Sequence, residues 1–258
     1  MASRLKVIDT LMQAHLIHTF QAHQSQITSL AVVQKPRLVI TASADGKLRV
    51  WNLETSNLHS QLEGYPGIPS CVAAFPSSTF VVSGGNDGTL VIWNSESSEH
   101  IRTMLKHRQR ITAISMAPDR KRFASGDTSG TLCVWNSVSG QLQNFYHIHT
   151  SISSLTFMPD GRHLIVGSSD DSSQIIVIDI TTGHIDKRFK DAHHGITSIA
   201  ITADGQELIT GSPDGDLAIW QWSEGAIRQT VETHMGTAVT AIMPNRRYAV
   251  IGTQTPRL

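Results

Sequence analysis

The sequence is poor in cysteine, in net charge and in long apolar runs, and each shortage excludes a class of protein. Its two cysteines, Cys71 and Cys133, have no Cys-x-x-Cys spacing and cannot form the framework of a disulfide-rich secreted domain. Lys plus Arg balance Asp plus Glu at 21 each, so the domain as a whole has no charge excess that would attract nucleic acid or anionic membrane. No segment approaches the roughly 18 apolar residues of a membrane span, and the first residues contain no signal-peptide stretch. We therefore expect a soluble, cytoplasmic protein that does not bind membranes.

What the chain does have is an internal repeat. Apolar quartets such as Leu48-Arg49-Val50-Trp51 recur and end at residues 51, 93, 135, 178 and 220, at spacings of 42, 42, 43 and 42. A fixed period determines the architecture more firmly than local propensity does.

Each period contains the pattern of four strands. A tight-turn signal such as Ala44-Asp45-Gly46 precedes the quartet, and a short apolar strand precedes that turn. An alternating stretch such as Ile27-Thr28-Ser29-Leu30 lies further upstream, and a more polar segment such as 58–62 follows the quartet. Four antiparallel strands in roughly 40 to 45 residues are typical of one blade of a β-propeller. The sequence therefore predicts an all-β propeller.

The same residues closely resemble the WD-repeat family over essentially the whole chain. Trp51-Asn52, Trp93-Asn94 and Trp135-Asn136 stand at its signature dipeptide, with Asn where Asp is commoner. Ile178-Asp179 keeps only the Asp, and Trp220-Gln221 keeps only the Trp. The resemblance implies four-stranded antiparallel blades that together hold other proteins.

The resemblance also implies a buried polar network in each blade. Its members are a His ahead of the first strand, a Ser or Thr in the second strand, an Asp in the tight turn and the Trp of the third strand. A connected set satisfies buried polar groups and fixes the register of the strands. Two repeats have complete sets, which are His23, Thr41, Asp45 and Trp51 in repeat one, and His193, Thr210, Asp214 and Trp220 in repeat five.

The other three repeats have incomplete sets, and we expect packing to hold them more than the polar network does. Repeat two has Ser83, Asp87 and Trp93, with Tyr65 near the His position. Repeat three has His107, Ser125 and Trp135, with Ser129 in place of Asp. Repeat four has His149 and Asp171, with Gly167 and Ile178 at the remaining positions.

The chain begins and ends in the middle of a repeat. Leu5 aligns with the third-strand quartets, and the segment around Val239 and Val250 supplies two further strands, so six repeats fit, the sixth split between the two termini. We expect one propeller domain over 1–258, either as a closed ring without exposed sheet edges or as a partly open ring cut from a longer protein. The expected boundaries are 1–22 for the third and outer strands of the split blade, 23–64, 65–106, 107–148, 149–192 and 193–233 for complete blades, and 234–258 for the first two strands of the split blade.

Catalytic and metal-binding motifs are missing from the sequence. It contains no phosphate-binding loop, no Gly-x-Ser-x-Gly elbow and no His-Glu-x-x-His, and the repeat already accounts for most of its histidines. The best metal-binding candidates are His147-x-His149 and His193-His194. The run Asp170-Asp171-Ser172-Ser173 offers oxygen ligands, but we interpret it as a lengthened turn. We expect no enzyme activity, no metal and no cofactor.

The function expected from the resemblance is a non-catalytic scaffold or adaptor for other proteins or peptides, with no obligate homo-oligomer unless the ring is open. The candidate partner-binding positions lie in the loops before the first strands and in the tight turns: Gln24, Gln26, Ala44, Asn86, Arg108, Arg110, Thr128, Asp170, His194 and Pro213. One alternative is a regulatory or sensor segment of a larger signalling NTPase or other multidomain protein. A lesser one is recognition of phosphate or nucleic acid through the basic run that contains Arg108 and Arg110, although the balanced charge argues against nucleic acid.

Overall fold

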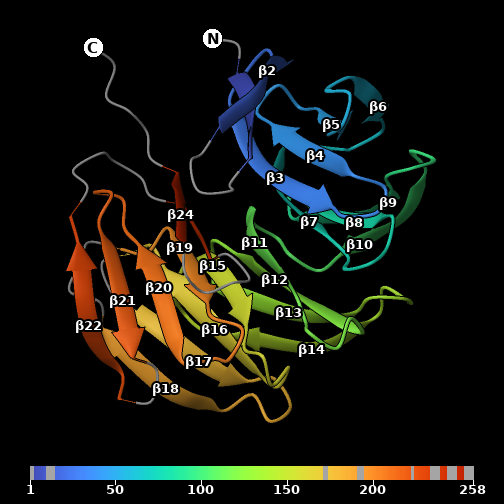
Figure 1. Ribbon diagram of the computed structural model, residues 1–258. Coiled ribbons are helices and arrows are strands. Elements are labelled where there is room, and N and C mark those ends of the chain that lie inside the picture. The colour runs from blue at the N-terminus through green and yellow to red at the C-terminus, as the bar shows by residue number, and fades with distance from the viewer. Residues whose placement is uncertain are drawn as a thin grey trace. The chain divides into compact units, whose positions relative to one another are not determined.

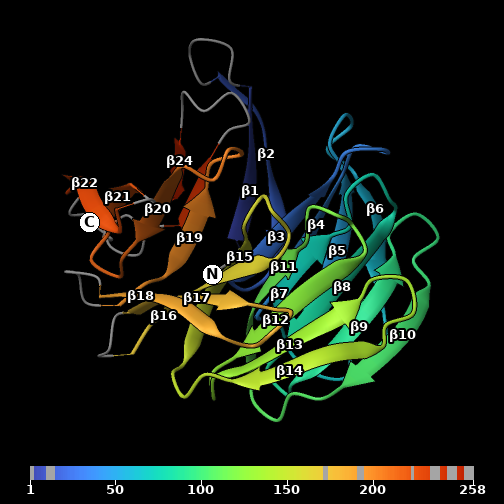
Figure 2. The ribbon, with the colours of Figure 1, turned by 90° about the horizontal axis from the view of Figure 1, so that it is seen from below.

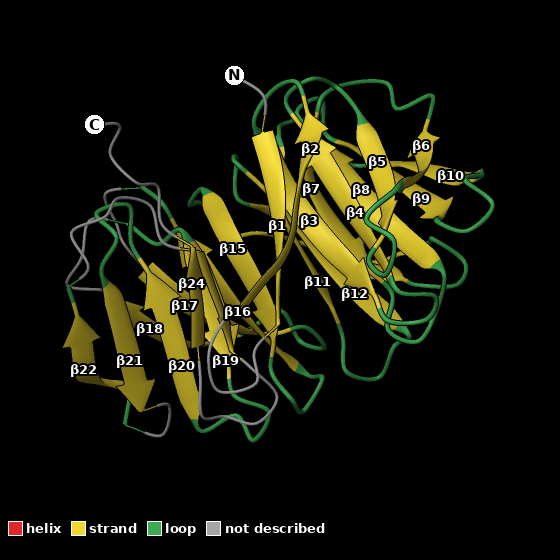
Figure 3. Cartoon of the chain, turned by 45° about the horizontal axis from the view of Figure 1, so that its top comes forward, coloured by secondary structure: helices red, strands yellow, loops and turns green. Residues whose placement is uncertain are grey.

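The computed structural model describes residues 3–9, 15–170, 174–190, 195–221, 224–232, 239–242 and 249–252. Every regular element in these ranges is a β-strand (Figure 3), which confirms the all-β class. Accordingly, none of these ranges holds a helix with the length and apolarity needed to cross a membrane. The chain divides into two compact units, Met1–Ile111 and Thr112–Leu258, which are taken in turn.

The first unit contains two complete blades, each a four-stranded antiparallel sheet with its strands in chain order (Figure 1). Blade one comprises β3 (Ile27–Val33), β4 (Leu38–Ser43), β5 (Leu48–Asn52) and β6 (Leu58–Leu62). Blade two comprises β7 (Pro69–Ala74), β8 (Phe80–Gly85), β9 (Thr89–Asn94) and β10 (His100–Leu105). Ahead of them, β1 (Ser3–Asp9) and β2 (His15–His23) form a two-stranded antiparallel sheet.

The second unit contains three complete blades of the same topology (Figure 2). Blade three comprises β11 (Ile111–Met116, whose first residue closes the first unit), β12 (Arg122–Asp127), β13 (Thr131–Asn136) and β14 (Leu142–His147). Blade four comprises β15 (Ile152–Phe157), β16 (His163–Ser168), β17 (Gln174–Asp179) and β18 (Ile185–Lys190). Blade five comprises β19 (Ser198–Ile201), β20 (Glu207–Gly211), β21 (Leu217–Gln221) and β22 (Ala226–Val231), and β23 (Val239–Ile242) pairs with β24 (Ala249–Gly252).

The second and third strands of each blade are mostly buried on both faces. All six residues of β4 are buried, whereas five of the six residues of the outer strand β10 are exposed. An apolar strand can be buried on both faces only if neighbouring sheets cover it. The hydrophobic clusters accordingly contain residues from two adjacent blades. One joins Ile40 of blade one to Trp93 of blade two, and another joins Leu132 of blade three to Ile176 of blade four.

Hydroxyl groups also tie the first strands of neighbouring blades together. The Thr28 hydroxyl donates to the carbonyl of Pro69 at 3.0 Å, that of Ser70 donates to the carbonyl of Ile111, and that of Thr112 donates to the carbonyl of Ile152. Each donor stands second in its strand, and each acceptor stands first in the first strand of the next blade. These bonds fix where the first strands of blades two, three and four begin, and therefore where the loops that lead into them end.

The five complete four-stranded repeats of the predicted propeller are thus confirmed. The assembly of 1–22 and 234–258 into one split blade stays a prediction, and so does the assignment of residues 1–258 to a single domain.

Candidate functional site

Blade one brings together its four predicted network residues. The indole N–H of Trp51 donates to Oγ1 of Thr41 at 2.9 Å, and this oxygen lies 2.7 Å from Nε2 of His23. Nδ1 of His23 lies 3.0 Å from a carboxylate oxygen of Asp45. The carboxylate also accepts backbone N–H bonds from Gln24 and Lys47. The tight turn, the loop before β3 and the third strand are therefore linked through one chain of bonds.

The surroundings of His23 in this hydrogen-bond network favour a neutral imidazole. Burial lowers the pKa of His23. Burial alone would raise the pKa of Asp45, but the hydrogen bonds from His23, Gln24 and Lys47 hold it below its ordinary value. A neutral histidine donates through one ring nitrogen and accepts through the other, so Nδ1 donates to Asp45 and the Thr41 hydroxyl donates to Nε2.

The order Thr41, His23, Asp45 is also that of a nucleophile, a base and an orienting acid. A nucleophile must be reachable by substrate, and here Thr41 is 0% exposed and His23 1% exposed. The hydroxyl is also occupied by the indole of Trp51. The geometry is therefore that of a structural network. The buried Cys71 thiol is no better as a nucleophile, because burial raises its pKa to about 12.

Blades two, three and five keep the bond between the second and third strands. Trp93 donates to Ser83 and Trp135 to Ser125, both at 2.8 Å, and Trp220 donates to Thr210 at 3.0 Å. In blade two the remaining residues act differently from those of blade one. The Tyr65 hydroxyl donates to the carbonyl of Thr89 at 2.7 Å, and Asp87 accepts bonds from the backbone N–H and the hydroxyl of Thr89.

Blade three uses an aspartate that sequence reasoning missed. Asp127, fully buried, accepts bonds from the N–H and hydroxyl of Ser129 and from the N–H of Thr131. It stands where blade one has Ser43, whose hydroxyl accepts the N–H of Asp45. The serine and aspartate have exchanged places between the two turns, and an Asp two residues after Ser125 was the available signal. His107 is buried in the first unit.

Blade four corrects two assignments. Strand register places Val166 opposite Ile176 as Thr41 lies opposite Arg49, so Val166, not Gly167, occupies the Ser or Thr position. The cause is a longer hairpin, in which Gly167 pairs with Ile175 whereas Ala42 pairs with Leu48.

The predicted histidine of blade four is also replaced. His149 is exposed and packs edge-to-face on His147, with ring centroids 4.5 Å apart. Thr150 is buried and donates to Asp170, which also accepts the N–H of Ser151 at 3.3 Å. A one-residue shift in a shortened loop accounts for the error. Asp171 and His193 lie outside the described residues, and Asp214 of blade five is exposed.

The candidate partner-binding residues lie in two segments at the same end of each blade. We call these the leading loop, which precedes the first strand, and the tight turn, which joins the second and third strands. Of the ten candidates, Asp170 is partly buried and His194 lies outside the described residues. The other eight are exposed: Gln24, Gln26, Ala44, Asn86, Arg108, Arg110, Thr128 and Pro213.

Backbone contacts hold these exposed residues in place. Ala44 N–H donates to the carbonyl of Gln26 at 2.9 Å, and Asn86 N–H donates to that of Ile68 at 3.0 Å. The tight turn of blade two also packs against residues 107–109. Gly88 has φ +81, and a Cβ there would lie 2.5 Å from the carbonyl oxygen of His107, so only glycine fits this approach. Exposed side chains thus stand on a fixed backbone.

The family model described as WD domain, G-beta repeat matches the chain five times, at residues 14–52, 56–94, 98–136, 140–175 and 183–221. The chain belongs to the WD-repeat family. Four of the matches begin at or just before β2, β6, β10 and β18 and run through β5, β9, β13 and β21, the third strands of the following blades, whereas the match at 140–175 ends at the second residue of β17. WD repeats in general form scaffolds for protein–protein interaction and are typically not enzymes. No curated protein sequence matches the chain significantly.

The WD-repeat dipeptide has a visible role here at its second position. Oδ1 of Asn52 accepts the N–H groups of Glu54 and Thr55 at 2.8 and 3.0 Å, and Asn136 does the same for its own turn. Asp179 caps the corresponding turn of blade four through Thr181. Only an acceptor oxygen at this reach is needed, which explains why Asn replaces Asp.

The two basic runs of this WD-repeat chain, residues 106–110 and 120–122, are used differently. Arg122 pairs with Asp119 at 2.8 Å and donates to the carbonyl of Gly161, so it holds the turn of blade three to blade four. Arg108 and Arg110 are exposed, and neither has a hydrogen bond or ion pair to any residue the structure describes.

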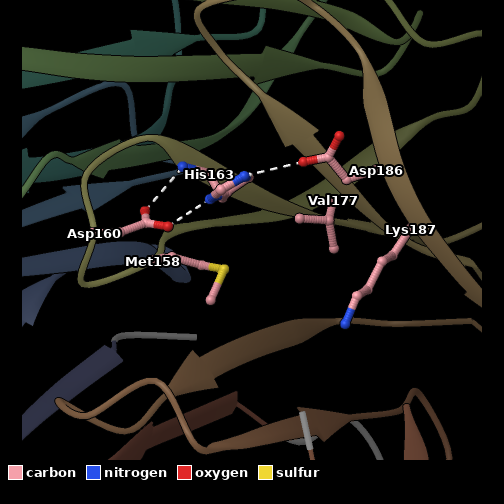
Figure 4. Close-up of a pocket in the computed structure, with 6 residues that line it drawn as sticks. All are labelled: Met158, Asp160, His163, Val177, Asp186 and Lys187. Carbon is pink, nitrogen blue, oxygen red and sulfur yellow. Dashed lines mark hydrogen bonds and ion pairs between the residues drawn. The ribbon is translucent and has the colours of Figure 1, made fainter. Parts of the chain in front are cut away.

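A cavity of about 210 Å³ lies on blade four (Figure 4). Its lining residues are Met158, Asp160, His163, Val177, Asp186 and Lys187. Nδ1 of His163 contacts Asp160, and Nε2 lies 3.0 Å from Asp186. Because carboxylates occupy both ring nitrogens, His163 links the turn before β16 to β18 and offers no vacant nitrogen for acid–base chemistry. Across the described ranges, no group of three or more His, Cys, Asp or Glu residues is placed to hold a metal ion.

Proposed function

We propose that this chain is a non-catalytic scaffold that binds partner proteins or peptides through the leading-loop ends of its blades. The observation that carries the proposal is the contrast between a fixed backbone and varied, exposed side chains at these ends. Gln24, Asn86, Arg108 and Thr128 differ in charge and size, yet the turns beside them are hydrogen-bonded into the blades. A rigid frame with diverse exposed loops lowers the entropic cost of binding and supplies specificity.

Site-specific photo-cross-linking in cells tests which end of the blades contacts partners. A photoreactive amino acid is placed at Gln24, Asn86 or Thr128, one position in each of the first three blades. The matched controls are the opposite ends of the same blades, at Glu54, Glu96 and Val138, which are also exposed. We expect partner adducts from the first set. Equal adducts from both sets, or adducts from the control set alone, would contradict the proposal.

A regulatory or sensor segment of a larger signalling NTPase would use the same surface. It differs from a constitutive scaffold in one measurable respect, because its cross-links at Asn86 would then change with the nucleotide supplied to the full-length protein. Recognition of nucleic acid would instead show binding that weakens steeply with salt.

We keep the sequence-based proposals that 1–22 and 234–258 contribute strands to one blade and that the location is cytoplasmic. Size-exclusion chromatography with light scattering tests the first of these. A monodisperse monomer with one cooperative unfolding transition supports a single domain, whereas association through open sheet edges contradicts it.

A further inference from the structure

Three segments that carry basic or apolar residues lie beside the tight turn of blade two. Ile68 of the leading loop exchanges two hydrogen bonds with Asn86 of this turn, both at 3.0 Å. Leu105 at the end of β10 pairs with Thr89, which follows the turn. We call Ile68, Leu105, Arg108 and Arg110 the blade-two patch.

The arginines of the patch are anchored through their backbone neighbours. The position of a Cβ on Gly88 lies 2.5 Å from the carbonyl oxygen of His107 and 3.1 Å from that of Gln109, on either side of Arg108. Ile111, which follows Arg110, is held to blade two by the hydroxyl of Ser70. Both guanidinium groups therefore leave the chain from positions fixed against blade two.

The patch exposes both chemical types to solvent. Ile68 is 43% exposed and Leu105 77% exposed, so each presents apolar surface to solvent on its own side of the turn. Neither guanidinium has a hydrogen bond or ion pair to a described residue. The acidic residue of the same turn, Asp87, is engaged by Thr89 through two bonds.

We propose that the blade-two patch binds an acidic peptide segment of a partner protein, whose carboxylates face Arg108 and Arg110 and whose apolar side chain packs on Ile68 or Leu105. This rests on the proposed function and names the chemistry of the partner at one leading-loop end. Planar guanidinium groups suit carboxylates because they can donate two parallel hydrogen bonds. Nucleic acid fits less well, because single strands bind on aromatic stacking platforms and the apolar members of the patch are aliphatic.

Fluorescence anisotropy with the full chain tests the proposal. The probe is a fluorescein-labelled peptide of glutamate residues around a central leucine, and its control has glutamine in place of every glutamate. The test variant is Arg108→Gln with Arg110→Gln. The matched control is Arg120→Gln with Lys121→Gln, which removes the same charge from exposed side chains of the other basic run. Thermal unfolding of each variant verifies that it is folded.

We expect the glutamate probe to bind the wild type and the glutamine probe to fail. The Arg108 and Arg110 variant should weaken binding roughly tenfold, as expected for two solvent-exposed ion pairs, and the control variant by less than about twofold. Replacing Ile68 and Leu105 by serine should weaken the leucine-containing probe but not a probe of glutamate alone.

Three results would overturn the proposal: no binding of the glutamate probe to wild type, equal loss in both charge variants, or displacement of the probe by oligothymidylate at lower concentrations than by unlabelled peptide. The cross-links at Asn86 are read separately. If partner adducts form at Asn86 and are unchanged by the arginine substitutions, the proposal of an acidic partner segment is wrong while the scaffold proposal stands. If no leading-loop position gives adducts, the scaffold proposal fails whatever the probe does.

Discussion

The hydroxyl of Thr41 should be worth more to stability than the equivalent hydroxyl of Ser83. The Thr41 hydroxyl oxygen accepts the indole N–H of Trp51 and lies 2.7 Å from Nε2 of His23, whereas that of Ser83 accepts the indole N–H of Trp93 and has no described histidine beside it. Both hydroxyls also lie at 3.4 to 3.5 Å from a carbonyl of the facing third strand, so this longer contact is common to the two sites. Thr41→Val and Ser83→Ala each remove the oxygen with little change in shape. The comparison therefore isolates the bond to histidine.

The magnitude follows from the number of buried groups left without a partner. Each orphaned buried donor or acceptor costs about 1 to 3 kcal/mol. Ser83→Ala leaves one such group, the indole N–H of the fully buried Trp93. Thr41→Val leaves two, the indole N–H of Trp51 and Nε2 of the buried His23. We expect the second variant to be less stable than the first by about 1 to 3 kcal/mol.

Urea unfolding followed by tryptophan fluorescence and circular dichroism measures this difference, provided that both variants keep the m-value of the wild type. Equal destabilisation of the two variants, within about 0.5 kcal/mol, would refute the reasoning. It would mean that His23 is satisfied without Thr41, and that the network is not a single connected unit.

Three further predictions concern single features of the fold. The pKa of folded His23 lies below 6.5, so the unfolded chain takes up a proton first, and the stability present above pH 6.5 should fall as the pH drops below 6.5. Asp45 should add a further loss of stability only below pH 3.8. His23→Gln should flatten the dependence of stability on pH around 6.5, as measured by urea unfolding at a series of pH values. Gly88→Ala should lower Tm more than Gly46→Ala. Both glycines have φ near +80, so alanine costs about 1 kcal/mol at either position, but of these two positions only Gly88 would place the new Cβ against a carbonyl oxygen. Equal decreases in Tm would contradict this. Tyr65→Phe should cost about 1 kcal/mol in thermal unfolding because it removes the hydroxyl that donates to the carbonyl of Thr89, and no change would show that water replaces the hydroxyl.

Much of the fold was predictable because its signals are periodic. The quartets ending at residues 51, 93 and 135 coincide with the ends of β5, β9 and β13 to within one residue. Each quartet is a third strand buried on both faces, and this burial demands the same apolar pattern every time. The Trp bonds of blades one, two, three and five depend on that same register, which is why positional mapping placed them together.

The polar network was less predictable because it depends on loop length rather than period. In blade four a shorter leading loop and a longer hairpin shift the relevant residues to Thr150, Val166 and Asp170, although the period changes by only one residue. In blade three the Ser and Asp of the turn have exchanged places, since either residue can accept the backbone N–H that the turn presents. Spacing alone cannot distinguish such compensating changes.

The bonds between blades explain how the leading loops can vary without loss of the fold. The hydroxyls of Thr28, Ser70 and Thr112 bind the next blade at the first residue of its first strand, just after the leading loop ends. Whatever sequence the loop carries, the strand after it begins at a fixed place. Blade two accordingly tolerates Tyr65 near the position where blade one has His23. This separation of a repeated strand frame from loops of varied sequence is what a binding scaffold requires, because partner specificity can then change at the loops while stability is retained in the strands.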